Sequence, residues 1–157
     1  MIRYAWYRRA VATSQPVEDA PAGDVVLYDG HCGLCSRSVR FIARHDARGR
    51  FRFAALQSDV ARTLLDGTPD LPAQLPDSVI LVAADGAVLV ESEAALRIAA
   101  ALDGPVRHLA RLQVVPRPIR DAVYRLVART RYRIFGRHDE CEIPAPWLRE
   151  RFLDGAA

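Results

Sequence analysis

Cys32 and Cys35 form a Cys-x-x-Cys pair whose surroundings indicate thiol chemistry. The apolar run at residues 25–28 predicts a strand before the pair, and amphipathic spacing after it predicts a helix. A thiol attacks only as its thiolate, and the free N–H groups and positive dipole end of a helix N-terminus favour that anion. We therefore predict a redox-active dithiol in which Cys32 lies where this field is strongest.

The two sulfurs are expected to have different roles. Cys35 shares the spacing of Val39, Ile42 and Ala43, which is that of the buried stripe of a helix. This pattern predicts that Cys35 points inward and that Cys32 is the exposed thiol. Cys32 would then attack a substrate disulfide, and Cys35 would resolve the mixed disulfide.

A different class of function remains open for the same pair. A Cys-x-x-Cys is also half of a zinc site, or two small buried hydrophobic residues. The alternative is a non-catalytic zinc-binding or interaction module that uses Cys32, Cys35, Cys141 and a histidine. The candidate histidines are His31, His45, His108 and His138. The strand-to-helix context favours redox chemistry over this module.

The composition predicts one domain and excludes several functions. Half of the 157 residues are hydrophobic, which suffices for a core, and no apolar run approaches the roughly 18 residues that span a bilayer. The N-terminus lacks the apolar region of a signal peptide, and three cysteines do not suit a disulfide framework, so we expect a cytoplasmic protein. No phosphate loop or flavin or nicotinamide fingerprint is present, so we expect no cofactor and an external dithiol or small thiol as electron donor.

Charge gives no prediction of nucleic-acid binding. All 22 basic residues are arginines and offset 19 acids, which leaves a net charge of only +3. The arginines crowd residues 107–137, where a basic face for an anionic partner is one interpretation. A solvated helix face is the favoured one, because charges on amphipathic helices usually face water.

The apolar patterns predict an α/β fold that begins near Asp24, after a leader at residues 1–23. Strands are expected at 25–28, around 51–53, at 79–82 and at 88–90, with an Asp85-Gly86 turn between the last two. Helices are expected from Cys35 to about 49, from about 58 to 67, and from Ser92, as N-cap, to about 104. The order β-α-β-α-β-β-α is that of the thioredoxin fold.

Residues 105–157 are expected to add a helical extension that packs on this 24–104 core. Pro118 stands at a first-turn position of the longest predicted helix. The apolar residues on the side expected to be buried are Ile119, Ala122, Val123, Leu126 and Val127.

Three blocks of residues carry a resemblance to a known family. They are residues 27–35, the Asp77-Ser78 step, and residues 131–136, and the match as a whole covers roughly residues 24–153. The chain resembles the DCC family, named for its Asp-x-x-Cys-x-x-Cys motif and regarded as thiol-disulfide oxidoreductases of thioredoxin-like fold. The resemblance assigns the motif to Asp29, Cys32 and Cys35 and implies the fold and the reaction class. From the dithiol chemistry we expect a disulfide-containing protein or a low-molecular-weight thiol as partner.

The residues around the motif have less certain roles. Asp29 is expected to accept N–H bonds from the cysteine loop, and the alternative is a proton acceptor for Cys35. A protonated His31 would stabilise the thiolate, although an ordinary loop histidine is an equal interpretation. Cys141 lies between acids that disfavour a thiolate, so it is expected to be non-catalytic unless the tail brings it to Cys32.

The substrate is expected to lie against two segments. One is Gly33 and Leu34, between the cysteines, and the other is the loop of Pro76, Asp77 and Ser78. In thioredoxins this second loop carries a cis-proline just before the third strand, where a substrate backbone can pair. Here two residues separate Pro76 from the strand, so either Pro76 is displaced or Ser78 takes its place. The oligomeric state is left open.

Overall fold

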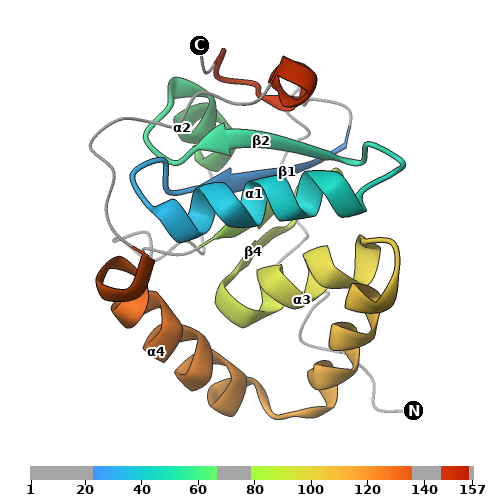
Figure 1. Ribbon diagram of the computed structural model, residues 1–157, viewed down its shortest axis with the longest axis vertical. Coiled ribbons are helices and arrows are strands. Elements are labelled where there is room, and N and C mark those ends of the chain that lie inside the picture. Colours follow the sequence, from blue (N-terminus) through green and yellow to red (C-terminus); the bar gives the residue numbers. More distant parts are fainter. Residues whose placement is uncertain (1–22, 67–78, 136–145, 156–157) are drawn as a thin grey trace.

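The protein has the thioredoxin-like α/β fold that the sequence predicts (Figure 1). The computed structural model describes residues 23–66, 79–135 and 146–155. Its elements are β1 (Asp24–Tyr28), α1 (Gly33–His45), β2 (Phe51–Ala55), α2 (Asp59–Leu65), β3 (Ile80–Val82), β4 (Val88–Val90), α3 (Glu91–Ala101), the 3₁₀ helix η1 (Pro105–Val114), α4 (Arg117–Phe135) and the 3₁₀ helix η2 (Pro146–Arg151). The first seven follow the predicted order.

The four strands form one sheet in the order β2-β1-β3-β4. β1 runs parallel to β2, with Val26 opposite Phe53, and antiparallel to β3, with Val26 also opposite Leu81. β3 and β4 form the predicted antiparallel hairpin. Gly86 in its turn has a φ of 82°, a conformation that suits glycine and explains the Asp-Gly signal.

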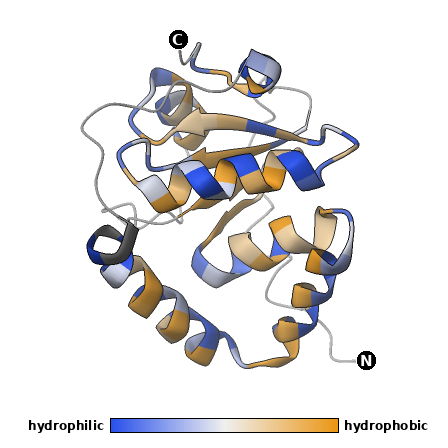
Figure 2. Cartoon of the chain, in the orientation of Figure 1, coloured by the Kyte–Doolittle hydropathy of each residue, from blue (hydrophilic) through white to orange (hydrophobic). Residues whose placement is uncertain are grey.

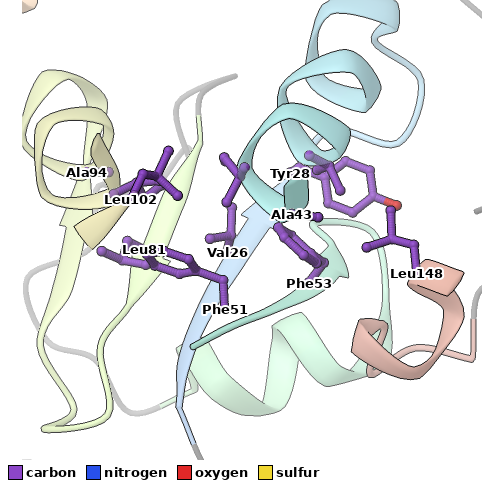
Figure 3. Packing of buried hydrophobic residues seen from close by; sticks show 12 residues of the cluster. Val26, Tyr28, Ala43, Phe51, Phe53, Leu81, Ala94, Leu102 and Leu148 are labelled. Atoms are coloured by element: carbon purple, nitrogen blue, oxygen red, sulfur yellow. The ribbon is translucent and has the colours of Figure 1, made fainter. Parts of the chain in front are cut away.

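Alternation along β1 divides the core between the two faces of the sheet. Val26 and Tyr28 pack with α1, α3 and Leu148 on one face, whose buried side chains are shown in Figure 3. Val25 and Leu27 pack with α2 on the other face. The sheet therefore lies between helices, and the C-terminal end of β1 leads directly into the loop that precedes α1.

The C-terminal segment is attached to the edge strand β2. The Leu153 N–H donates to the Phe53 carbonyl at 2.9 Å, and Asp154 Oδ2 accepts the Ala55 N–H at 2.6 Å. Arg151 contacts the fully buried carboxylate of Asp46 at 3.1 Å. The contacts of Leu153 and Asp154 supply partners to β2 backbone groups that an open edge would leave unpaired.

The start of α3 differs from the prediction. Ser92 is not its N-cap, because α3 begins at Glu91 and Val90 occupies the cap position. Ser92 is instead buried in the first turn, where its hydroxyl donates to the carboxylate of Asp121 on α4. The buried partner on another helix, which sequence alone does not reveal, explains the difference.

The orientation of α4 is also opposite to the prediction. Its apolar stripe faces outward, with exposed fractions of 56% for Ile119, 59% for Val123 and 63% for Leu126. Its buried side chains include Asp121 and Arg131, which are polar. Each has a charged or hydroxyl partner in the core, so tertiary ion pairs and hydrogen bonds decide which face turns inward.

None of the helices that the structure describes is both long enough and apolar enough to cross a membrane.

Candidate active site

The cysteine pair lies at the N-terminus of α1, as predicted. Cys32 is the N-cap residue, with extended backbone, and α1 begins at Gly33. Its N–H donates to the Asp29 carbonyl at 3.3 Å, and its own carbonyl accepts the Ser36 N–H at 3.1 Å. The Cys32 side chain makes no capping hydrogen bond to this end of the helix. Its unpaired N–H groups are therefore oriented to stabilise a negative charge close to the cysteines.

The expected exposure of the two thiols is wrong for Cys32. Cys32 has no accessible surface, whereas Cys35 is partly exposed. Cys35 nevertheless packs against the core cluster beside β1, as the helical stripe predicts. Helical periodicity applies to residues inside the helix, and the N-cap lies outside it, so the stripe carried no information on where Cys32 points.

The two thiols influence each other electrostatically. The pKa of Cys35 is raised to about 12, first by burial and then by a hydrogen bond to Cys32 and the negative charge of its thiolate. The positive charge of Arg131 and a backbone hydrogen bond at Asp29 oppose this rise. Cys35 is therefore protonated at neutral pH.

Asp29 organises the loop between β1 and α1. Its Oδ1 accepts the His31 N–H at 3.0 Å, the Asx-turn hydrogen bond expected of it, and the Gln57 side-chain amide at 3.3 Å. Its Oδ2 accepts from Arg131 Nη2 at 3.0 Å. Donors from the β1–α1 loop, from Gln57 and from α4 thus hold the Asp29 carboxylate, which lies just before the cysteines in the chain.

Arg131 is a site residue that sequence reasoning missed. It stands 102 positions from Asp29, on α4, and both side chains of the ion pair are almost completely buried. Sequence alone favours a solvated position for Arg131, as for the other arginines of residues 107–137. The available signal was its position at the start of the third DCC-like block, residues 131–136.

Tyr124 is a second α4 residue beside the thiols. Its hydroxyl accepts the Val79 N–H at 3.0 Å, which ties α4 to the residue just before β3. Burial raises the pKa of Tyr124, and the charge of Cys35 contributes to the rise. α4 therefore contacts both the cysteine loop, through Arg131, and the start of β3, through Tyr124.

The remaining predicted residues are placed only in part. The His31 ring is half-exposed, with Nδ1 3.9 Å from Asp29 Oδ1. Gly33 is buried at the start of α1, and Leu34 is half-buried. The other candidates, Pro76, Asp77, Ser78, His138 and Cys141, lie outside the described residues. Within the part of the chain that the structure describes, no three His, Cys, Asp or Glu side chains are grouped to hold a metal.

A dithiol at a helix N-terminus, beside the central strand of a thioredoxin-like sheet, defines the class of thiol-disulfide exchange proteins. Comparison with family models agrees, since the model for DCC1-like thiol-disulfide oxidoreductases matches residues 26–137. The chain belongs to this family.

Two relatives extend the comparison. The uncharacterised protein YuxK of Bacillus subtilis is 40% identical over 129 residues, which cover 82% of this chain and 93% of the relative. A chloroplastic DCC family protein of Arabidopsis thaliana is 41% identical over 120 residues, covering 76% of this chain and 69% of the relative. No solved structure matches the chain at a significant level.

Proposed function

We propose that the protein exchanges disulfides with a protein or small-thiol substrate through the Cys32–Cys35 dithiol. Cys32 is the attacking thiol and Cys35 the resolving thiol. The observation that carries the proposal is the inequality of the pair. Cys32 is the N-cap residue of α1, whereas Cys35 lies inside the helix and its pKa is raised to about 12.

The reaction balances as two displacements. The Cys32 thiolate attacks one sulfur of the substrate disulfide, so a Cys32–substrate bond forms and the first substrate thiolate leaves. Cys35 then gives its proton to the first substrate thiolate and attacks Cys32 Sγ, so the internal disulfide forms and the second substrate thiolate leaves. Two electrons pass to the substrate, and an external dithiol or low-molecular-weight thiol returns them.

The causes of the raised pKa of Cys35 also explain why the second displacement follows the first. Two of the three raising causes depend on Cys32, namely its hydrogen bond and its negative charge. Both are lost once Cys32 Sγ is bonded to substrate. The pKa of Cys35 then falls, while the opposing charge of Arg131 remains, so the resolving thiol becomes a better nucleophile when it is needed.

Asp29 serves in this proposal as an organiser of the loop and not as the base. The carboxylate already accepts three hydrogen bonds, one of them from the Arg131 guanidinium at 3.0 Å. Arg131 offsets the negative charge that Asp29 brings near the thiols. Without that compensation, a buried carboxylate would disfavour the Cys32 thiolate through like-charge repulsion.

The burial of Cys32 bears on the first displacement. Because its side chain has no accessible surface, a substrate disulfide reaches Cys32 Sγ only when covering residues move. The segments proposed to meet the substrate are Gly33 and Leu34, between the cysteines, and residues 76–78, which include Pro76, Asp77 and Ser78. We place the reaction in the cytoplasm, where thiols are kept reduced and a Cys-x-x-Cys is more often catalytic than structural.

Trapping of the mixed disulfide tests these assignments. Reduced protein is treated with a small symmetric disulfide, and the products are read by intact mass and peptide mapping. Cys35→Ser should accumulate the mixed disulfide at Cys32, whereas the wild type should proceed to the internal disulfide. Cys141→Ala in every variant removes the background thiol. A mixed disulfide that accumulates on Cys35 in Cys32→Ser, with none on Cys32 in Cys35→Ser, would reverse the roles.

A further inference from the structure

η1 and α4 expose an apolar surface that the redox site does not use. Nine large hydrophobic side chains are exposed among the described residues, and seven of them belong to these two elements. We call these seven, with the exposed arginines beside them, the η1–α4 surface. Its apolar members are Leu109, Leu112, Val114, Ile119, Val123, Leu126 and Val127, and its arginines are Arg107, Arg111, Arg129 and Arg133.

The apolar side chains line up along one side of each element. Ile119, Val123, Leu126 and Val127 are spaced as one stripe of an α-helix. Leu109 and Leu112 are three residues apart, which puts them on one side of a 3₁₀ helix. Figure 2 shows hydrophobic segments recurring along both elements at the rim of the molecule.

The charge of this region is strongly asymmetric. Residues 105–135 contain eight arginines and one acid, a formal charge of +7, while the whole chain carries +3. Arg117, Arg120, Arg125 and Arg131 have acidic partners. Within the described part of the chain, the four arginines of the η1–α4 surface have none. Their charge is therefore available to a partner.

We propose that the η1–α4 surface binds an anionic lipid membrane. Exposed aliphatic side chains flanked by arginines fit the boundary between acyl chains and anionic headgroups, where a helix lies in the membrane plane. The inner face of α4 is fixed to the core through Arg131 and Asp121, so its apolar stripe is held outward without a change of fold. Binding in this way would place α4 between the lipid and the Cys32–Cys35 dithiol.

The same observations disfavour other occupants. A second copy would bring together two surfaces that each carry four exposed arginines, and like charges facing each other are costly. Single-stranded nucleic acid binds basic grooves that also offer aromatic rings for stacking, and the apolar members of the η1–α4 surface are all aliphatic. An acidic protein with an apolar face is the remaining alternative partner. The vesicle experiment described next distinguishes that partner from a membrane.

Co-sedimentation of the full chain with lipid vesicles tests the proposal. We expect binding to phosphatidylcholine vesicles that contain roughly one third phosphatidylglycerol, and little binding to phosphatidylcholine alone. Binding should fall steeply as salt rises from about 50 to 500 mM, because screening shortens the reach of the arginines.

Matched variants locate the surface. Arg129→Gln with Arg133→Gln should lower the partition coefficient about 25-fold, a factor of about five for each arginine. Arg37→Gln with Arg44→Gln removes two exposed arginines from α1 and should leave binding within about twofold. Leu126→Ser should weaken binding roughly tenfold, and Phe41→Ser, at an exposed apolar residue of α1, should not.

Three outcomes would overturn the proposal. They are no binding to anionic vesicles at low salt, equal losses in the α4 and α1 variants, and a stable homodimer that buries the η1–α4 surface. None of these readouts depends on the redox state of the cysteines, so the test is independent of the proposed function.

Discussion

At the scale of single residues, Cys32 and Cys35 are chemically unequal although both belong to one short motif. Cys35 is protonated because it is partly buried and because it faces the charge of Cys32. Arg131, from the far end of the chain, acts in the opposite direction on the same thiol. The balance between these neighbours sets the order of the two displacements.

Replacing Cys32 should make Cys35 more acidic. Cys32→Ala removes both the hydrogen bond and the charge that raise the pKa of Cys35, while the burial that also raises it remains. We therefore expect the pKa of Cys35 to fall below about 12 in the reduced variant. Thiolate absorbance at 240 nm against pH measures it, with Cys141→Ala in both proteins. An unchanged or higher pKa in Cys32→Ala would contradict the coupling.

Breaking the Asp29–Arg131 pair should be costly from either side. Each of Arg131→Met and Asp29→Asn removes one charge of a buried ion pair, which costs about 3–5 kcal/mol of unfolding free energy. The double variant should cost less than the sum of the two, and denaturant unfolding measures all three. Arg131→Met should also raise the pKa of Cys35 further, a shift that loss of stability alone does not produce.

The control for this pair is Arg125→Met on the same helix. Arg125 lies 3.6 Å from Glu91 but its side chain is 55% exposed, so its loss should cost no more than about 1 kcal/mol. If Arg131→Met and Arg125→Met cost the same, the buried pair does not have the role assigned to it.

At the scale of elements, α4 joins the parts of the site. Its inner face bears Asp121, Tyr124 and Arg131, which reach α3, the start of β3 and the cysteine loop respectively. Its outer face bears the apolar stripe. The polar inner contacts therefore decide both where Arg131 lies and which face is offered to a partner.

Removing the α3–α4 hydrogen bond should loosen this helix. Ser92→Ala leaves the buried Asp121 carboxylate without its hydroxyl partner, although Arg117 still contacts it at 3.2 Å. We expect a loss of about 1–3 kcal/mol of unfolding free energy. Ser38→Ala, which removes an exposed hydroxyl bonded within α1, should stay within about 0.5 kcal/mol. Equal effects of the two substitutions would argue against a special role for Ser92.

The elements could be predicted from sequence better than their orientations. Residues 25–28 and 80–82 are apolar runs between turn signals, and Ser58 is the N-cap of α2, where its hydroxyl accepts the Ala61 N–H. For α4 the same rules gave the helix but the wrong buried face. Apolar periodicity contains no signal for a buried ion pair such as Asp29–Arg131, because its partners are charged and lie 102 residues apart. The Cys-x-x-Cys motif and Asp29 could be found locally, whereas Arg131 and Tyr124 required the tertiary structure.

At the scale of the whole molecule, the C-terminal segment packs against the sheet and its core. Leu148 is buried against the same cluster as Val26 and Phe53, and Phe152 packs on Tyr28 and Phe53. The fold therefore uses residues from β1 to the end of the described chain. Contacts between such distant parts connect the stability of the sheet to the extension.

Two adjacent residues test this contribution. Leu148→Ala should cost about 2–5 kcal/mol of unfolding free energy, because Leu148 is only 1% exposed and its loss leaves a cavity. Trp147→Ala, at a residue that is 52% exposed, should cost much less than Leu148→Ala. Denaturant unfolding of the two variants in parallel measures the difference. A small effect at Leu148 would mean that the C-terminal segment is not part of the cooperative unit.

The central claim is that Cys32 and Cys35 form a reversible two-electron couple, and its most direct measurement is their redox equilibrium in glutathione or dithiothreitol buffers. Thiol alkylation and intact mass give the oxidised fraction, with Cys32→Ser and Cys35→Ser as controls. We expect one reversible transition that needs both cysteines, with a potential between about −120 and −270 mV. Cysteines that never pair across these buffers, or pair only after a chelator removes bound zinc, would contradict the account and favour a metal-binding module.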